Sequence, residues 1–405
     1  MVRSLAKLAG SLLVAGVFWS IASPVRAEGP ANPGTLDTAK PADSQPYIPV
    51  QHIKIFAQPG RFGGWPANHG IWNWGNEILV GFSVGYYKDL GAERHNIDRD
   101  KPEEHVLARS LDGGMTWSIE HPAKQGVLIG AAKMRHGTLP TDVQEAEPTE
   151  VTEPIAFTNP NFAMTCRMGD TNKGASRLYY SYDRGKTWKG PFKLPLLGQP
   201  GIMARTDYLV DGPKSCLLFL TASKKNEREG RVICAATNDG GKSWGLRSAI
   251  GPEPEGYSIM PSTVRLSPRA LVTTIRRLDK KPSFLEAWSS KDDGKSWSLA
   301  NGRIAETGEG NPPALLRLQD GRLCITYGVR SAPYRMAAKF SSDGGKTWSK
   351  EVVLRADGGG RDLGYPRSIQ RPDGKVVTIY YFWDKQSGPE RYIAATIWDP
   401  KDVKE

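Results

Sequence analysis

The chain of 405 residues has few cysteines and no metal-binding motif. Neither Cys-x-x-Cys nor His-Glu-x-x-His occurs, so the sequence predicts no zinc site, and it predicts no cofactor. Apolar, strand-like runs surround each cysteine, which indicates buried free thiols, although an exported chain also permits disulfides. The four are Cys166, Cys216, Cys234 and Cys324.

Long apolar runs and runs of basic residues are also scarce. After residue 27 no stretch is long and apolar enough to cross a bilayer, so no membrane span is predicted for the mature chain. The formal net charge is +11, but the basic residues are spread along the chain. This distribution argues against a nucleic-acid partner and suits an anionic glycan.

The amino-terminal segment has the pattern of an export signal. Two basic residues precede an apolar run over residues 8–22, and small residues stand at the cleavage positions before and at Ala27. We therefore expect a signal peptide over residues 1–27 and a secreted or periplasmic protein; a single membrane anchor is the alternative. Residues 28–47, rich in Pro, Ala, Asp and Thr, are expected to form a flexible leader.

From residue 48 to residue 400 the pattern is that of a single all-β domain. The chain contains 44 Gly and 30 Pro, and short β-branched or aromatic runs alternate with Gly, Asp and Asn turns. Examples of such runs are residues 78–82, 177–180 and 376–381. No long segment has a helical period, so strands joined by tight turns are predicted throughout.

One turn of eight residues occurs five times, with the pattern Ser/Thr-x-Asp-x-Gly-x-Ser/Thr-Trp. Successive copies begin 71, 56, 53 and 51 residues apart, at residues 110, 181, 237, 290 and 341. Asp accepts backbone N–H bonds inside such a turn, and Gly supplies positive φ. The Trp is expected to anchor the hairpin on its own sheet. A repeat near 50 residues predicts radially packed sheets.

Six sheets account for the whole domain. Five carry the repeated turn, and unmarked strands after Arg361 supply the sixth. The strand over residues 50–56 is expected to join the last sheet and close the ring.

The five turns resemble the Asp-box repeats of the sialidase (neuraminidase) superfamily, whose members are six-bladed β-propellers. The resemblance covers most of residues 50–400 and implies an all-β, six-bladed β-propeller with five Asp-box hairpins. It also implies three arginines on a substrate carboxylate, a Tyr nucleophile activated by Glu, and an Asp acid/base. In that superfamily the boxes lie on the outside of the propeller, away from the active centre, so function must be argued from the site.

Carried over by position, the resemblance assigns three residues of the site. The segment 362–368 resembles the one that presents the nucleophile before a strand, which makes Tyr365 the catalytic candidate. Arg276 and Arg330 stand where strands of the fourth and fifth blades end, and they are candidates for substrate binding.

Two family features are missing from this sequence. The Arg-x-Pro signature of the first blade is replaced by Gly64-Trp65-Pro66, so Arg61 is the candidate for that role. The Glu before the fourth-blade strand is replaced by residues without a carboxylate, and Glu255 is the nearest substitute.

The acid/base is expected in the loop before the first Asp box. Asp98 is the preferred candidate, with Asp100 and His95 as alternatives, because catalytic groups commonly stand on loops. Further candidates for substrate binding are polar residues beside aromatic or strand-like runs: Arg205, Asp207 and His69.

The preferred hypothesis is an exported, monomeric glycoside hydrolase that releases terminal anionic sugars, sialic acid or similar, with retention through Tyr365. One alternative is a non-catalytic propeller that binds glycans or proteins. Another is a uronate-directed hydrolase or lyase that uses His69 or His95 as the base.

Overall fold

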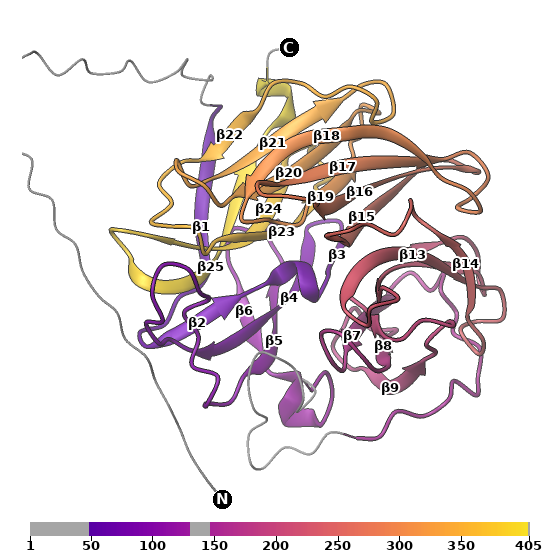
Figure 1. Cartoon of the computed structure of the whole chain (residues 1–405). Coiled ribbons are helices and arrows are strands. Elements are labelled where there is room, and N and C mark those ends of the chain that lie inside the picture. Colours follow the sequence, from indigo (N-terminus) through magenta and orange to yellow (C-terminus); the bar gives the residue numbers. More distant parts are fainter. Residues whose placement is uncertain (1–47, 130–145, 404–405) are drawn as a thin grey trace, which may run out of the picture. The chain divides into compact units, whose positions relative to one another are not determined.

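The computed structural model describes residues 48–129 and 146–403 (Figure 1). The predicted signal peptide and leader lie outside these residues. The described chain is nearly all β, and its antiparallel sheets form the six blades of a β-propeller. Both the all-β class and the six-bladed architecture predicted from the sequence are confirmed.

Blades 1 to 3 come first along the chain. Blade 1 contains β2 (Arg61–Gly64), β4 (Glu77–Tyr86), β5 (Glu104–Ser110) and β6 (Ser118–Glu120), with β3 (Ile71–Trp74) paired to β4. Blade 2 contains β7 (Ala163–Met168), β8 (Ser176–Ser181) and β9 (Lys189–Leu194). Blade 3 contains β10 (Ile202–Met203), β12 (Cys216–Ser223), β13 (Glu229–Thr237) and β14 (Gly245–Ala249), with β11 (Tyr208–Val210) paired to β12.

Blades 4 to 6 complete the ring. Blade 4 contains β15 (Tyr257–Ser267), β16 (Ala270–Leu278), β17 (Ser283–Ser290) and β18 (Ser298–Gly308). Blade 5 contains β19 (Ala314–Arg317), β20 (Leu323–Val329), β21 (Arg335–Ser341) and β22 (Val352–Arg355). Blade 6 contains β23 (Gly364–Gln370), β24 (Val376–Asp384), β25 (Gly388–Trp398) and β1 (Val50–Phe56). Three short 3-10 helices are η1 (Pro66–Asn68), η2 (Pro122–Gln125) and η3 (Pro400–Asp402).

The ring is closed by the first described strand. β1 pairs antiparallel with β25, and Val50 lies opposite Trp398. The last blade is therefore built from both ends of the propeller domain, as the sequence predicted. Hydrogen bonding between these strands resists opening of the ring, because separating them would expose both strand edges.

The five Asp boxes close by the same hydrogen bonds. In the first box, one Asp112 oxygen accepts the Thr116 N–H at 2.9 Å and the other accepts the Thr116 hydroxyl at 2.6 Å. The Ser110 hydroxyl donates to Asp112 and accepts the N–H of Gly114, both at 2.8 Å. Gly113 has φ of 76°, a conformation that glycine adopts without a steric cost.

The sequence predicted that the Trp of each box packs on its own sheet. In the structure its ring packs on the preceding blade as well. Trp188 of blade 2 lies 5.7 Å from Trp72 of blade 1, between ring centroids, and joins a cluster with Leu79 of blade 1. Trp297 of blade 4 lies 6.3 Å from Phe219 of blade 3. The indole therefore fills the space between two twisted sheets. In this way the repeated turn also sets the distance between neighbouring blades.

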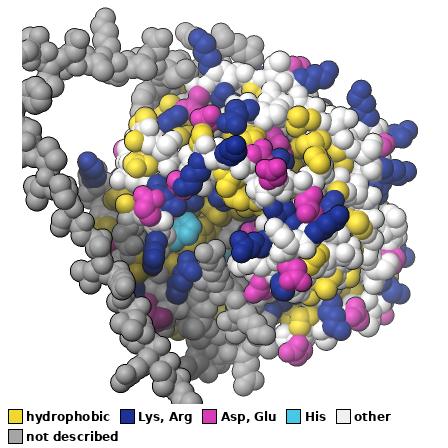
Figure 2. Space-filling view, in the orientation of Figure 1, with side chains coloured by type: hydrophobic (Ala, Val, Ile, Leu, Met, Phe, Trp, Pro, Cys, Tyr) yellow, Lys and Arg dark blue, Asp and Glu magenta, His cyan; other side chains and the backbone are white. Residues whose placement is uncertain are grey.

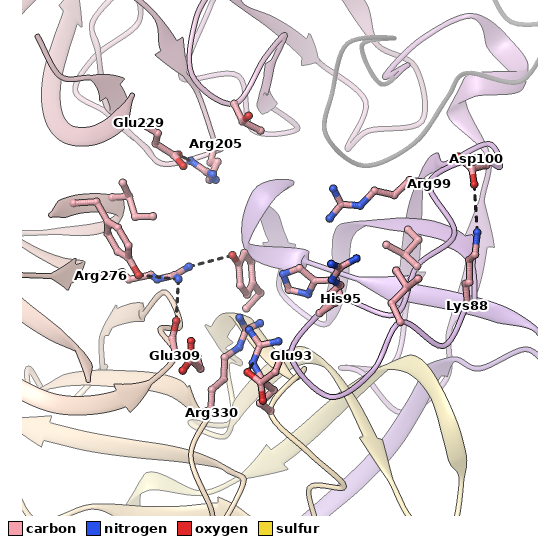
Figure 3. A pocket seen from close by; sticks show the side chains of 18 residues that line it. Lys88, Glu93, His95, Arg99, Asp100, Arg205, Glu229, Arg276, Glu309 and Arg330 are labelled. Atoms are coloured by element: carbon pink, nitrogen blue, oxygen red, sulfur yellow. Dashed lines mark hydrogen bonds and ion pairs between the residues drawn. The ribbon is translucent and has the colours of Figure 1, made fainter. Parts of the chain in front are cut away.

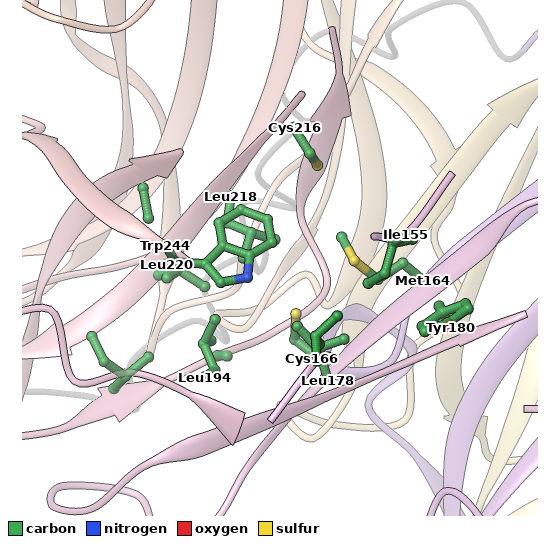
Figure 4. Close-up of a cluster of buried hydrophobic side chains, with 14 of the residues drawn as sticks. Ile155, Met164, Cys166, Leu178, Tyr180, Leu194, Cys216, Leu218, Leu220 and Trp244 are labelled. Carbon is green, nitrogen blue, oxygen red and sulfur yellow. The ribbon is translucent and has the colours of Figure 1, made fainter. Parts of the chain in front are cut away.

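Apolar side chains between the blades form the core. Figure 4 shows the cluster between blades 2 and 3, where Cys166 and Cys216 lie among aliphatic side chains and Trp244. All four cysteines are buried and free, which confirms the prediction of free thiols. In the described part of the chain, no helix has the length and apolar character needed to cross a membrane.

Candidate active site

One pocket of about 750 Å³ gathers residues from all six blades at one end of the hub (Figure 3). Blade 2 contributes Thr171 from the loop between β7 and β8, and blade 1 contributes the long loop between β4 and β5. The charged lining residues are Lys88, Glu93, Arg94, Arg99, Asp100, Arg205, Glu229, Arg276, Glu309, Arg330 and Arg361.

Cations outnumber carboxylates in this lining by seven to four. Basic side chains also gather around a visible histidine on the face drawn in Figure 2. Because opposite charges attract over a pocket with low-dielectric walls, the site favours an anionic guest.

Tyr365 stands at a bulge near the start of β23. Its φ is 50°, and the pairing of β23 with β24 shifts between Gly364 and Arg367. A left-handed tyrosine costs on the order of 1–3 kcal/mol and must be held by its surroundings. Asn311, which is fully buried, holds it: its oxygen accepts the Tyr365 N–H at 2.8 Å, and its nitrogen donates to Leu363 O at 2.9 Å.

Two guanidinium groups lie against the Tyr365 phenol. Arg276 donates to the Tyr365 oxygen at 3.2 Å and to the Tyr257 oxygen at 3.0 Å. The Arg330 guanidinium lies 5.1 Å from the centre of the Tyr365 ring. Burial alone raises the pKa of Tyr365, but the charges of Arg276, Arg330 and Arg205 outweigh burial, and the pKa is lowered from its usual value of 10.

A histidine of the pocket lining, beside Arg330, is paired with a buried carboxylate behind it. Asp362 is 1% exposed and accepts four bonds: from His95 Nδ1 at 2.6 Å, from the Tyr381 hydroxyl at 2.6 Å, from Arg391 Nε at 3.0 Å and from the Asn96 N–H at 3.4 Å. Burial opposes ionisation of Asp362, but these cationic and hydrogen-bonding partners hold its pKa far below the usual range. Arg330 also donates to the Tyr381 hydroxyl.

The opposite wall carries an ion pair and further guanidinium groups. Arg205 donates to the Glu229 carboxylate at 2.6 Å and to the Asn68 oxygen at 3.0 Å. Arg276 Nε is buried there without a hydrogen-bond partner among the described residues, as are Nε and Nη1 of Arg361 on the side of His95, where Arg361 Nε lies 4.0 Å from Glu93. Unsatisfied buried donors are costly, and donors of this kind in a pocket lining can be satisfied by an anionic ligand.

The profile of the BNR repeat-like domain family matches residues 162–378, just over half of the chain. The chain belongs to this family. It is a propeller of the sialidase superfamily, with Asp-box turns spaced as its blades require. Among curated relatives, a sialidase of Bacteroides fragilis is 27% identical over 318 residues, which span 71% of this chain and 56% of that protein. The chain thus spans about half the length of this relative.

Solved structures show how widely this BNR propeller fold is shared. A protein of unknown function from Dyadobacter fermentans has a TM-score of 0.65 at 19% identity and covers 86% of this chain and 99% of its own. The NanB sialidase of Streptococcus pneumoniae has a TM-score of 0.56 at 10% identity, covering 86% and 71%. An α-L-arabinanase of Penicillium chrysogenum has a TM-score of 0.55 at 12% identity, covering 89% and 100%. These likenesses show the fold.

In this BNR propeller, four of the preferred candidates from the sequence line the same pocket, as do the two alternatives for the acid/base, His95 and Asp100. The four come from β16, from the residue after β20, from the segment between β10 and β11, and from β23: Arg276, Arg330, Arg205 and Tyr365. Their roles remain predictions.

Three other candidates do not line the pocket. Arg61 donates to Gly85 O at 2.8 Å and stacks on Tyr86. Asp98 pairs with Lys88 at 3.2 Å. The side chain of Glu255 is exposed, and its backbone oxygen accepts a hydrogen bond from Lys224 at 2.8 Å.

The remaining two candidates line separate cavities. His69 is buried in a cavity of about 10 Å³ and bonds Ser83 at 3.1 Å; burial holds its pKa well below 6.5. Asp207 lies beside a cavity lined by Trp72 and Trp74, bonds the Thr263 hydroxyl at 2.9 Å, and has its pKa raised to about 7 by burial. In residues 48–129 and 146–403, no group of three or more His, Cys, Asp or Glu side chains is placed to hold a metal.

The sequence analysis did not single out three residues that organise the site: Asn311, Asp362 as the partner of His95, and Arg361. One signal was available. Trp65, Met260 and Tyr365 each precede a proline, and all three have positive φ, of 57°, 56° and 50°. Residues before proline avoid the right-handed α region, and here each marks a break in strand geometry at the hub.

Proposed function

We propose that this chain is an exported glycoside hydrolase that releases terminal anionic sugars, with Tyr365 as the nucleophile. The observation that carries the proposal is the contact of Arg276 and Arg330 with one phenol inside a pocket whose lining is mainly cationic. Guanidinium forks bind a carboxylate through two parallel hydrogen bonds and stay charged at any working pH. The pattern of residues 1–27 supports export.

Arg276 and Arg330 would both bind the substrate carboxylate and activate the Tyr365 nucleophile. A sugar carboxylate between Arg276 and Arg330 would place the adjacent anomeric carbon near the Tyr365 oxygen. The lowered pKa of Tyr365 increases the phenolate fraction at neutral pH, because Arg276 and Arg330 stabilise the phenolate. Attack on the anomeric carbon and later hydrolysis invert the centre twice, which gives net retention.

Two tyrosines on one guanidinium provide a matched test. In purified protein, Tyr365→Phe should lower kcat on an aryl α-sialoside by at least about 1,000-fold, because the nucleophile is lost. Tyr257→Phe also removes a hydroxyl bonded to Arg276, and it should cost no more than about tenfold. Retained activity in Tyr365→Phe would reject the nucleophile. Glycan binding by wild-type protein with no turnover would favour a binding propeller.

A second candidate function is a uronate-directed lyase. It is favoured by His95, whose burial lowers the pKa of its ring so that the neutral base predominates at neutral pH. Such an enzyme would remove the proton next to the uronate carboxylate and leave a carbon–carbon double bond. Incubation with uronate oligosaccharides and measurement of near-ultraviolet absorbance distinguishes the two: an unsaturated product supports the lyase, and a reducing sugar without absorbance supports the hydrolase.

A further inference from the structure

The proposed hydrolysis needs a proton donor for the departing oxygen, and the two acidic candidates of the loop between β4 and β5 are poorly placed. Asp98 faces Lys88 and Lys101, at 3.2 and 4.0 Å, and does not line the pocket. Asp100 lines it, but its side chain is 88% exposed and pairs with Lys88. Asp100 is solvated, and Asp98, although its side chain is only 12% exposed, is engaged by two lysines away from the pocket lining.

His95, in the same loop, is placed differently. Its side chain is 21% exposed and lines the pocket, while its Nδ1 lies 2.6 Å from the Asp362 carboxylate. An ionised carboxylate only accepts, so the Nδ1 proton belongs to this bond and Nε2 is the nitrogen that can exchange a proton. Figure 3 shows the imidazole of His95 facing the cavity across from Arg276.

The imidazole is fixed by its surroundings. Trp65 meets it edge to face, with ring centroids 5.3 Å apart and planes at 89°. Asp362 is itself oriented by Tyr381 and by Arg391. A carboxylate that is itself held in place therefore sets both the tautomer and the direction of the ring, the arrangement that positions histidine for proton transfer.

The same contacts connect His95 to the nucleophile. The Tyr381 hydroxyl bonds the Asp362 oxygen that also accepts from His95, and the Tyr381 ring lies 6.0 Å from the Tyr365 ring. The Arg330 guanidinium lies over both tyrosine rings, at 5.1 and 5.9 Å from their centres. His95 and Tyr365 thus face one pocket from either side of Arg330 and Tyr381.

We infer that His95 is the acid/base catalyst of the hydrolysis and that Asp362 is its positioning residue; this rests on the proposed function above. The Tyr365 phenolate forms a bond to the anomeric carbon while the bond to the leaving oxygen breaks, and protonated His95 gives its Nε2 proton to that oxygen. A water then attacks the anomeric carbon and gives a proton to His95 Nε2. The bond to Tyr365 breaks, and the phenolate and the imidazolium are restored.

The charges around His95 define its pH dependence. Burial lowers its pKa most, Asp362 raises it, and Arg330 and Arg361 lower it again, which leaves the pKa below 6.5. The acid form is therefore lost as pH rises through this lowered value. We expect turnover of substrates with poor leaving groups to fall over the same range.

Leaving-group dependence tests the inference. In His95→Gln, turnover of a methyl sialoside should fall at least about 100-fold, because a poor leaving group needs a proton. Turnover of a nitrophenyl sialoside should fall less than about threefold in its first step, measured as the burst, because that leaving group departs unprotonated. His121→Gln is the matched control: its Nδ1 also lies 2.8 Å from a carboxylate, that of Glu104, but it does not line the pocket.

Asp362→Asn tests the positioning role through the pH profile. Without the carboxylate the pKa of His95 should fall, so the loss of activity on methyl sialoside should begin at a lower pH. A variant that merely folds poorly would lose activity at all pH values equally, and thermal melts identify it. Equal losses on both substrates with an unchanged pH profile in His95→Gln would overturn the inference. An active Tyr365→Phe, or an inactive wild type, would instead overturn the hydrolase and this inference with it.

Discussion

The Asp boxes and the central pocket differ in where their polar groups find hydrogen-bond partners. In a box, the carboxylate of Asp112 takes its hydrogen bonds from residues within four positions along the chain. In the pocket, Arg276 meets Tyr365 from a different blade, and its Nε has no partner among the described residues. Structural polar groups are satisfied locally, whereas the groups of the site are assembled by the whole fold and leave donors for a guest.

The two regions also shift pKa values by different means. Desolvation opposes ionisation of Asp112, but the hydroxyl and N–H of Thr116 and the hydroxyl of Ser110 together outweigh it and lower its pKa to about 2. Burial strongly opposes ionisation of Tyr365, and charges from blades 3, 4 and 5 lower its pKa nevertheless. Short-range bonds tune the boxes, and long-range charge tunes the pocket.

The largest effect is expected where a box stabilises the ring. Trp188→Ala should lower the free energy of unfolding by about 3–5 kcal/mol, because a buried indole between blades 1 and 2 is removed. Denaturant unfolding measures the loss, and kcat of the folded fraction should be unchanged. Leu111→Ala, in an exposed position of the first box, is the control. A drop in the kcat of Trp188→Ala at unchanged stability would contradict the view that the boxes serve stability and the pocket serves activity.

The next effect belongs to the pocket. Arg276→Lys keeps a positive charge but loses the fork, so kcat/KM on an aryl sialoside should fall about 100-fold, equivalent to roughly 2.7 kcal/mol. Arg277→Lys, on the neighbouring position of β16 and paired with Asp279, should have little effect because it does not line the pocket. Equal kinetics in the two variants would remove Arg276 from the site.

The fold could be predicted from the sequence because each box is a local device. Its Ser, Asp, Gly and Trp stand at fixed spacing, and the spacing itself gives the size of a blade. The packing of the box Trp was harder to predict. The sequence shows which turn carries Trp188, but it does not show that Trp188 packs against Leu79 of the preceding blade.

The site was predictable only where a residue stands at a strand end. Arg276, Arg330 and Tyr365 converge because each lies where a strand of its blade meets the pocket end of the hub. Asp362 and His95 are 267 positions apart, and no local pattern pairs them. The sequence also could not show which residue of the loop that contains Asp98 enters the site. The fold, and not the spacing, decides which side chain of the loop faces the pocket.

A smaller effect is expected for a single box carboxylate. Asp112→Asn keeps the shape of the side chain but loses its charge, so the free energy of unfolding should fall by about 1 kcal/mol. Thermal or denaturant unfolding at neutral pH measures this. Lys346→Gln, at an exposed position of the fifth box, should leave stability unchanged. An equal loss in both variants would mean that any substitution in a box has this cost, and that the hydrogen bonds of the Asp112 carboxylate are not responsible.

The smallest effect is expected at low pH, where the difference in stability between wild type and Asp112→Asn should disappear. The pKa of Asp112 is about 2 in the folded chain and near 3.8 when unfolded, so its ionised form stabilises the fold at any pH above 3.8. The contribution is lost as pH falls through the folded value, because both states are then protonated. The gap in melting temperature between wild type and Asp112→Asn should therefore be full at pH 6 and shrink towards zero near pH 2, as followed by circular dichroism. A gap that persists in acid would show that the introduced amide distorts the turn, and it would remove the charge-based account of the box.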